Sequence, residues 1–295
     1  MSTSKIVSVV KRITAHPLFV MVLEFFAIGF AIAIPQIAAQ ALAPPVGRTD
    51  FQELFVNSAT ALSCIAVYWL LTHYLERKPF TDFVLAGAAR EWGVGAAIGA
   101  GAMVLTIAVI AALGGYRITG TNGPEVLTAV AAMAIISGVT EEILLRGVVF
   151  RLFEQWLGSV AALVFSAGLF GVLHITNPNA SWLAAFAIAI EAGVMLGAIY
   201  MLTRRLWAAI GLHMAWNATQ GGVFGVKVSG TNIDGLLISQ SSGSEWISGG
   251  AFGAEASLPA MLICTFIGLY ILRRAHREGQ FIPMSWARFK GKPNG

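Results

Sequence analysis

Long apolar stretches alternate with short polar turns along almost the whole chain. A helix needs about 20 mainly apolar residues to cross the roughly 30 Å of hydrocarbon in a bilayer. Eight stretches come close to or exceed this length, and they lie at 17–43, 54–75, 92–114, 125–150, 158–176, 182–203, 206–225 and 257–273. The pattern predicts an all-α, polytopic membrane protein folded as a bundle of eight transmembrane helices.

The composition of the chain agrees with this prediction. Of the 295 residues, 57% are hydrophobic and only 12% are charged, and the mean hydropathy is +0.74. Soluble domains carry about twice that share of charged residues. The longest polar stretch, at 227–257, is rich in Gly and Ser and is too short for a soluble domain. We therefore predict a single membrane domain over residues 1–295.

The first apolar stretch has two interpretations. Lys11 and Arg12 precede it, and Ala41-Leu42-Ala43 resembles a cleavage site, as in a secretory signal peptide. Its apolar run is longer than the core of a signal peptide, which has about 7–15 residues. We therefore favour a retained first helix.

Basic residues fall mainly on one side of the predicted membrane. Sixteen of the 19 Lys and Arg residues lie at the termini and in the even-numbered turns, whereas the opposite turns hold only Arg48, Arg117 and Lys227. Cytoplasmic loops carry an excess of basic residues, so we predict a cell-membrane protein with both termini cytoplasmic. The pI near 9.3 then reflects loops that face anionic membrane lipid. No basic stripe with interleaved aromatic residues indicates nucleic acid as a partner.

Small residues recur in the third apolar stretch. Gly93, Ala97 and Gly101 are spaced four apart, which places them on one face of a helix and allows a second helix to approach closely. This second helix could belong to the same bundle or to another protomer. We favour packing within the bundle.

Ionisable residues at the middle of a membrane helix cost about 2.5–3.5 kcal/mol each, and here they cluster. Glu142 and Arg146 lie four apart in TEEILLRG and can pair on one helical face. Glu141 is turned by about 100° from its neighbour, which leaves it free to face a cavity and to act as a base. His213 and Asn217 are also four apart, and they present two hydrogen-bond donors toward one point, as an oxyanion site requires.

A helical hairpin would bring these groups together. If the chain turns at Leu157-Gly158, Glu141 and His174 are equally far from the turn and lie at one height. His213 lies at a similar depth when counted along its own helix. A structural role is the simplest explanation for one such residue, but six of them on three helices at matching depth favour a catalytic site.

Two further glutamates lie within apolar stretches. Glu24 is near the start of its helix, where an interfacial position would explain it. Glu191 is at mid-span, where it could support the bundle or line the same cavity as the clustered residues.

Three motifs carry a resemblance to a known family. They are EExxxR (Glu141, Glu142 and Arg146), FxxxH (Phe170 and His174) and HxxxN (His213 and Asn217). Their order and spacing resemble the CAAX protease and bacteriocin-processing (CPBP) family of intramembrane endopeptidases. The resemblance is specific over about residues 125–220, which we expect to be the catalytic core, and ISGGAFGAEASL resembles a bacterial branch of the family.

The resemblance implies a role for each motif. Glu141 and His174 would activate a water molecule, and His213 and Asn217 would stabilise the oxyanion. Glu142 and Arg146 would support the site. The substrate would be a hydrophobic or lipidated peptide or protein.

The residue types also support hydrolysis without the family. A carboxylate in a poorly solvated cavity is a strengthened base, and general base catalysis contributes about 10²–10⁴-fold. No serine lies at nucleophile spacing in the motifs, and neither Cys64 nor Cys264 is near a histidine in the sequence. Water is therefore the predicted nucleophile.

Two alternatives to a metal-free protease stay open. Glu141, His174 and His213 form a two-histidine, one-carboxylate set, which is a common ligand set for catalytic zinc. The HExxH signature is absent and Asn217 is a poor zinc ligand, so we favour a site without a cofactor. A transporter or non-catalytic scaffold with buried charges is the alternative of another class, but the sequence lacks the paired broken helices typical of transporters.

Overall fold

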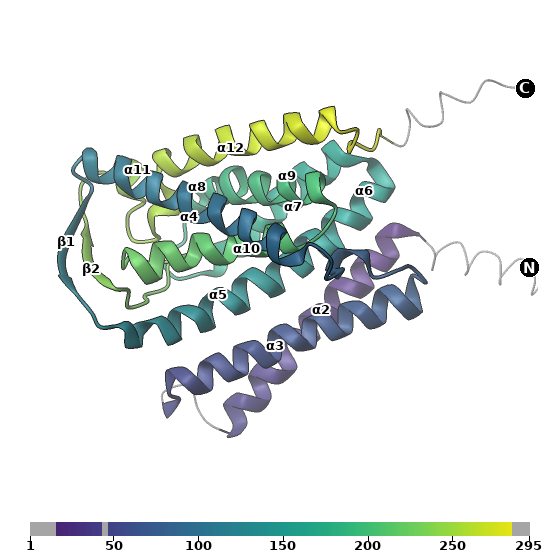
Figure 1. Ribbon diagram of the computed structural model, residues 1–295, viewed down its shortest axis with the longest axis horizontal. Coiled ribbons are helices and arrows are strands. Elements are labelled where there is room, and N and C mark those ends of the chain that lie inside the picture. Colours follow the sequence, from purple (N-terminus) through teal and green to yellow (C-terminus); the bar gives the residue numbers. More distant parts are fainter. Residues whose placement is uncertain (1–15, 43–46, 285–295) are drawn as a thin grey trace, which may run out of the picture.

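The computed structural model describes residues 16–42 and 47–284 and confirms the polytopic, all-α membrane fold (Figure 1). Within these residues, seven helical segments are long and apolar enough to cross a bilayer: Pro17–Leu42, Asp50–Leu75, Ala88–Ala112, Pro124–Leu157, Ser159–Thr176, Trp182–Thr203 and Leu258–Arg277. The protein is an integral, multi-pass membrane protein. The segment predicted at 206–225 forms a shorter helix, so the count of eight spans is not confirmed.

Several long helices contain π-helical turns, at which the backbone hydrogen bonds shift by one residue. In chain order the helical elements are α2 (Pro17–Leu42), α3 (Asp50–Leu70), η2 (Leu71–Leu75), η3 (Thr81–Phe83), α4 (Ala88–Ala112), η4 (Pro124–Val126), α5 (Leu127–Glu142), η5 (Ile143–Phe150), α6 (Arg151–Leu157), α7 (Ser159–Leu173), η6 (His174–Thr176), α8 (Trp182–Ile188), η7 (Ala189–Gly193), α9 (Val194–Thr203), α10 (Trp207–Asn217), η8 (Ala218–Val223), α11 (Glu245–Ser248), η9 (Ala254–Ala256) and α12 (Leu258–Arg277). The π-helical turns are η2, η5, η7 and η8. Three of these four adjoin or contain residues of the predicted site.

A two-stranded antiparallel sheet, which the sequence pattern did not predict, closes one end of the bundle. Strands β1 (Tyr116–Thr121) and β2 (Leu237–Ser241) pair so that Tyr116 is opposite Ser241. In Figure 1 the sheet lies at the left, whereas α2 begins and α12 ends at the right. The first and last described helices therefore reach the same side of the bundle.

Some of the sequence observations fall on residues outside the described ranges. These are the basic residues nearest the termini and the end of the signal-like motif: Lys5, Lys11, Arg12, Ala43, Arg288, Lys290 and Lys292. Which side of the membrane the termini occupy stays a prediction.

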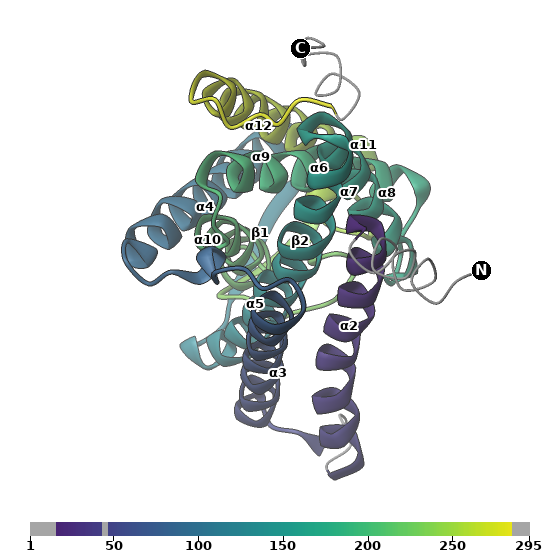
Figure 2. The same cartoon turned by 90° about the vertical axis from the view of Figure 1, so that its right-hand side faces the viewer.

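The short helix α10 lies between longer helices and packs on α4, α5 and α9 (Figures 1 and 2). Glycines on both partners allow α4 and α10 to approach closely. A Cβ atom at Gly95 would lie 2.0 Å from the Ala208 carbonyl oxygen, and one at Gly99 would lie 2.2 Å from the Leu212 carbonyl oxygen. Because no side chain fits there, these glycines fix the height and rotation of α10.

The close contact between α4 and α10 does not use the face of α4 that carries Gly93, Ala97 and Gly101. Gly93 and Gly101 have open space where a Cβ atom would be, and Ala97 is exposed with them. The prediction that Gly93, Ala97 and Gly101 mediate packing within the bundle is therefore wrong. Helix α4 carries two stripes of small residues, and the partner helix uses the other one.

The turn between the fourth and fifth spans is confirmed. Gly158 has a positive φ of 93° and separates α6 from α7, a conformation that favours glycine. The two helices form the expected hairpin, and they contact one another along the bundle.

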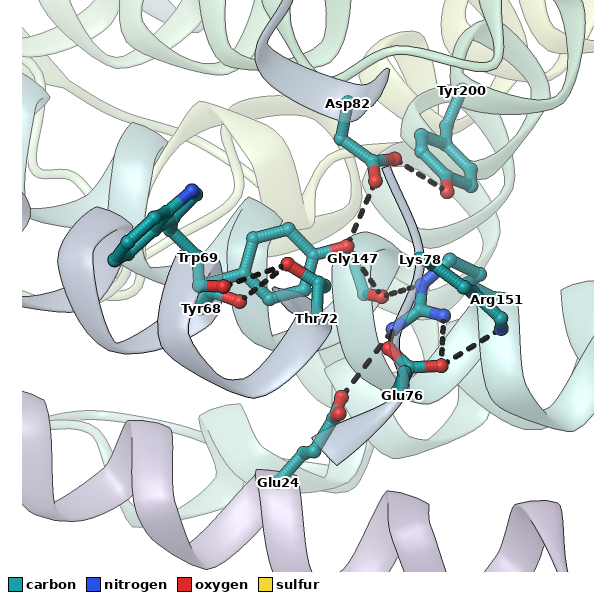
Figure 3. Close-up of polar contacts among 10 residues, drawn as sticks. All are labelled: Glu24, Tyr68, Trp69, Thr72, Glu76, Lys78, Asp82, Gly147, Arg151 and Tyr200. Carbon is teal, nitrogen blue, oxygen red and sulfur yellow. Dashed lines mark hydrogen bonds and ion pairs between the residues drawn. The ribbon is translucent and has the colours of Figure 1, made fainter. Parts of the chain in front are cut away.

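Arg151, at the start of α6, joins three helical segments at one end of the bundle (Figure 3). Its Nη1 and Nη2 atoms donate to Glu76 at 2.8 Å and 2.6 Å, and Nη2 also lies 3.3 Å from Glu24 Oε2. Burial alone would raise the pKa of Glu76, but the hydrogen bonds and charge of Arg151 outweigh it and hold this pKa below its usual value. Glu24 is fully buried within the bundle, and its depth in the membrane stays a prediction.

A second set of contacts continues this network toward the centre of the bundle (Figure 3). Asp82 accepts hydrogen bonds from Tyr68 at 3.0 Å and from Tyr200 at 3.1 Å. All three side chains are buried. The network therefore ties the connection between α3 and α4 to α9 through buried hydrogen bonds.

We predict that Gly99→Ala lowers the unfolding temperature of the protein in detergent, because the added methyl group overlaps the Leu212 carbonyl group. Overpacking of this kind costs about 1–3 kcal/mol. Gly101→Ala in the same helix is the matched control, and it should be neutral or more stable by up to about 1 kcal/mol, because alanine favours helix. Equal unfolding temperatures for the two variants would contradict the proposed role of Gly99.

Candidate active site

The centre of the site is a buried ion pair within one helix. Arg146 Nη1 donates to Glu142 Oε1 at 2.8 Å, and both side chains are fully buried. Arg146 Nη2 donates to the Ala192 and Gly193 carbonyl oxygens at 3.3 Å and 3.2 Å. These carbonyl groups belong to the π-helical turn η7, so the guanidinium group links the fourth span to the sixth.

His213 on α10 binds the same carboxylate. Its Nδ1 atom lies 2.9 Å from Glu142 Oε1, and because the carboxylate accepts, Nδ1 carries the proton. This contact fixes the ring and directs Nε2 away from Glu142. Glu141 Oε2 lies 3.9 Å from Nε2, which is beyond hydrogen-bonding distance, and it has no partner among the described residues.

His174, at the end of α7, is held by the residue one turn before it. Its Nδ1 atom lies 2.8 Å from the Phe170 carbonyl oxygen, which can only accept, so Nδ1 is the donor. In the neutral ring Nε2 then carries the lone pair and can accept a proton. The FxxxH spacing thus selects the tautomer of His174.

The ring of Phe170 lies beside both histidines and Arg146. It contacts His174 edge-on, with 4.6 Å between the ring centroids, and His213 with 6.0 Å. The Arg146 guanidinium carbon lies 4.8 Å from the centroid of the same ring. An aromatic ring at this position keeps the two imidazoles apart while it stabilises the cation.

Asn217 lies one turn after His213, as the sequence predicted, but its amide is partly engaged. Asn217 Nδ2 donates to Ser137 Oγ at 2.9 Å. An amide group has two N–H bonds, so one remains for another acceptor. Gly138 allows this approach, because a Cβ atom there would lie 2.4 Å from Met214 Cγ.

A small enclosed cavity connects these groups. His174, His213 and Asn217 line it together with Glu191, Ser229 and Glu255. Its volume of about 20 Å³ has room for a group the size of a water molecule. Apolar side chains, among them Ile188 and Trp216, complete the wall. The cavity is therefore a poorly solvated space bounded by two imidazoles, an amide and two carboxyl groups.

Glu255 enters the cavity from the long connection between η8 and α12. Its Oε1 atom accepts a hydrogen bond from the Ser229 backbone N–H, and Oε2 has no partner in the described part of the chain. Burial raises the pKa of Glu255 to about 8, against the opposing effect of the Ser229 hydrogen bonds. A carboxyl group with this pKa is mainly protonated at pH 7.

The structure brings the sequence-selected residues into one region. His174, His213, Asn217 and Glu191 line the cavity, so Glu191 lies where the sequence suggested it could. Glu141 lies beside His213, and the Glu142–Arg146 pair lies behind it.

Sequence reasoning missed Ser137, Ser229 and Glu255. Ser137 has a usable signal, because it precedes Glu141 by four residues on the same helical face. Glu255 has a weaker one, as the single charge in the apolar segment GAFGAEASL. Ser229 donates its backbone N–H to Glu255 and lies in a Gly- and Ser-rich connection, which gives it no signal in the side-chain pattern.

The zinc alternative concerns the positions of Glu141, His174 and His213. No group of three or more His, Cys, Asp and Glu side chains in residues 16–42 and 47–284 is placed to hold a metal ion. His213 Nδ1 lies 2.9 Å from Glu142 Oε1, and His213 Nε2 lies 3.9 Å from Glu141 Oε2. Zinc would require ligand atoms about 2.0–2.2 Å from one point.

Comparison with known proteins agrees with the resemblance carried by the motifs. Residues 123–219 match the family model described as type II CAAX prenyl endopeptidase, Rce1-like. This segment contains all three motifs. No curated protein and no solved structure matches the chain. Over this segment, about a third of the chain, the protein is similar to the CAAX-type membrane endopeptidases of the CPBP family.

Proposed function

We propose that the protein hydrolyses a peptide bond of a hydrophobic or lipidated peptide within the membrane, without a metal ion. The observation that supports this most directly is the cavity, in which His174 Nε2, His213 and Asn217 converge while Glu141 lies beside His213. It combines groups that can accept a proton with groups that can donate hydrogen bonds. General acid–base hydrolysis requires both sets within reach of one carbonyl carbon.

Glu141 and His174 activate the attacking water in this proposal. The proposal uses the lone pair on His174 Nε2 and the Glu141 Oε2 atom, which has no partner among the described residues, as its basic sites. Water transfers a proton to this pair as its oxygen bonds to the carbonyl carbon. The proton then passes to the departing nitrogen when the C–N bond breaks, which restores both groups.

His213 and Asn217 stabilise the oxyanion. The Glu142 carboxylate on Nδ1 favours a positively charged His213 ring, whose Nε2–H can then donate to the developing negative charge. The second N–H of Asn217 can donate from one helical turn away. Each such donor contributes about 10²–10³-fold to the rate.

Two neighbouring glutamates provide a test of these roles. We predict that Glu141→Gln lowers kcat by about 10²–10⁴-fold because the base is lost, while the unfolding temperature stays near that of the wild type. Glu142→Gln removes the partner of the buried Arg146 and should also cost about 3–5 kcal/mol of stability. Peptide cleavage by the purified variants and thermal unfolding in detergent measure the two effects.

Glu245→Gln is the control for this comparison, because Glu245 is exposed on α11, outside the proposed machinery. It should cleave peptide at the rate of the wild type. Wild-type activity in the Glu141→Gln variant would refute the assigned base. His174→Ala and His213→Ala should each lose activity as well.

Metal dependence is tested separately. We expect the purified protein to contain no stoichiometric zinc and to keep its peptidase activity after prolonged treatment with a strong chelator, because Glu141 and His174 act directly on water. The measurements are metal analysis and peptide cleavage before and after chelation. Activity that disappears on chelation and returns with zinc, but not with magnesium, would make Glu141, His174 and His213 ligands instead.

A further inference from the structure

Glu191 and Glu255 are the two buried carboxyl groups of the cavity that the proposed hydrolysis does not use. Glu191 is fully buried on η7, and Glu255 is 2% exposed on η9. Both oxygens of Glu191 and Oε2 of Glu255 lack a hydrogen-bond partner in the described residues. Three unsatisfied carboxyl oxygens therefore surround or adjoin one small space.

Such an arrangement is costly unless something else satisfies it. Burying a polar group without a partner costs stability, and two like charges close together add repulsion. Within the described ranges, no Lys or Arg forms an ion pair with either carboxylate. Arg146, on the neighbouring span, is already engaged by Glu142 and two carbonyl groups. A donor from outside the described part of the fold would satisfy these oxygens.

We propose that Glu191 and Glu255 form a subsite for a primary ammonium group of the peptide. The ammonium is either a lysine side chain next to the scissile bond or the α-amino group that cleavage releases. This inference rests on the proposed peptidase function. It names the chemical class that the substrate or product presents to the cavity.

Size and donor number favour a primary ammonium over other cations. An ammonium group ends in one heavy atom with three N–H donors, which matches three unsatisfied oxygens and a cavity of about 20 Å³. A guanidinium group is planar and has four heavy atoms, so it is too large for this space. A bound cation also stabilises the ionised form of neighbouring carboxyl groups.

The position of the subsite explains why the ammonium would belong to the peptide. Glu191 and Glu255 share the cavity with His174, His213 and Asn217, so a group bound there lies next to the reacting carbonyl. Both ammonium sources lie within a few bonds of the scissile C–N bond. The subsite would therefore set either the residue preference or the release of the product.

A binding experiment tests the subsite without using catalysis. Methylammonium chloride should raise the unfolding temperature of the wild-type protein and of Glu141→Gln by a few degrees relative to tetramethylammonium chloride at equal ionic strength, because only methylammonium has N–H donors. The difference should vanish in Glu191→Gln and in Glu255→Gln and persist in the exposed control Glu245→Gln. The proposal would be overturned if the two salts gave the same unfolding temperature in the wild type. It would also be overturned if methylammonium raised the unfolding temperature of both cavity variants as much as that of the wild type.

The same variants separate this role from a structural one. Because the carboxyl oxygens of Glu191 are unpaired, Glu191→Gln should not lower the unfolding temperature in the absence of ligand. A loss of stability in both Glu191→Gln and Glu255→Gln, with an unchanged response to methylammonium, would assign the pair to packing of the bundle.

Peptide substrates distinguish the two sources of the ammonium. If the source is lysine, replacing lysine with norleucine or arginine next to the scissile bond should lower kcat/KM at least about tenfold, a difference of about 1.4 kcal/mol. If the source is the released amine, product peptides with a free amino terminus should inhibit at least about tenfold more strongly than acetylated ones. Either discrimination should disappear in Glu191→Gln and Glu255→Gln.

The outcomes for the subsite and for the protease are separate. A wild-type protein could cleave peptides and yet show neither a preference for lysine nor stronger inhibition by products with a free amino terminus. That result would refute the subsite and leave the proposed protease function intact. A protein that cleaves no peptide, yet is stabilised by methylammonium through Glu191 and Glu255, would refute the peptidase and keep the ammonium site.

Discussion

The buried carboxylate of Glu142 is the interaction on which the rest of the site depends. It accepts from Arg146 within its own helix and from His213 on α10, and all three groups are almost completely shielded from solvent. Removing one member of such a buried set leaves an uncompensated charge, which costs more than the pair contributes. The set is therefore retained as a unit, and it fixes the orientation of the imidazole that faces the cavity.

Close backbone contacts position the elements that carry this set. Glycines on α4 bring the helix against the Ala208 and Leu212 carbonyl groups, so α10 has little freedom to slide or rotate. Gly138 allows α5 to approach Met214, between His213 and Asn217. The π-helical turn η7 presents two carbonyl groups to Arg146. Rigid backbone contacts thus place polar side chains that would otherwise cost stability in a membrane.

The glutamates of the site differ because their surroundings differ. Glu142 has two cationic or donor partners, Glu141 is one-third exposed, and Glu191 is buried without any hydrogen-bond partner in the described chain. Glu255 has one backbone donor, and burial raises its pKa to about 8. One residue type thus has four different environments within one site, which is the condition for the separate roles that we propose for these glutamates.

The sequence by itself determined the features that follow from helical periodicity and bilayer thickness. The apolar stretches specified an all-α membrane fold, and the spacing of four residues specified the Glu142–Arg146 pair, because residues one turn apart share a helical face. The turn at Gly158 and the resemblance of the motifs to a protease family also followed from short-range patterns. These signals are local, so no knowledge of neighbouring helices is needed to read them.

The tertiary structure alone decided which residues meet across helices. His213 binds Glu142 from 71 positions away, and Asn217 binds Ser137 from 80 positions away. Helix α4 carries two small-residue stripes of equal quality, and only the presence of α10 selects Gly95 and Gly99 over Gly93 and Gly101. Glu255 reaches the cavity from an irregular connection that has no repeating pattern. Periodicity gives the face of a helix on which a side chain lies, but the packing of the bundle decides what that face meets.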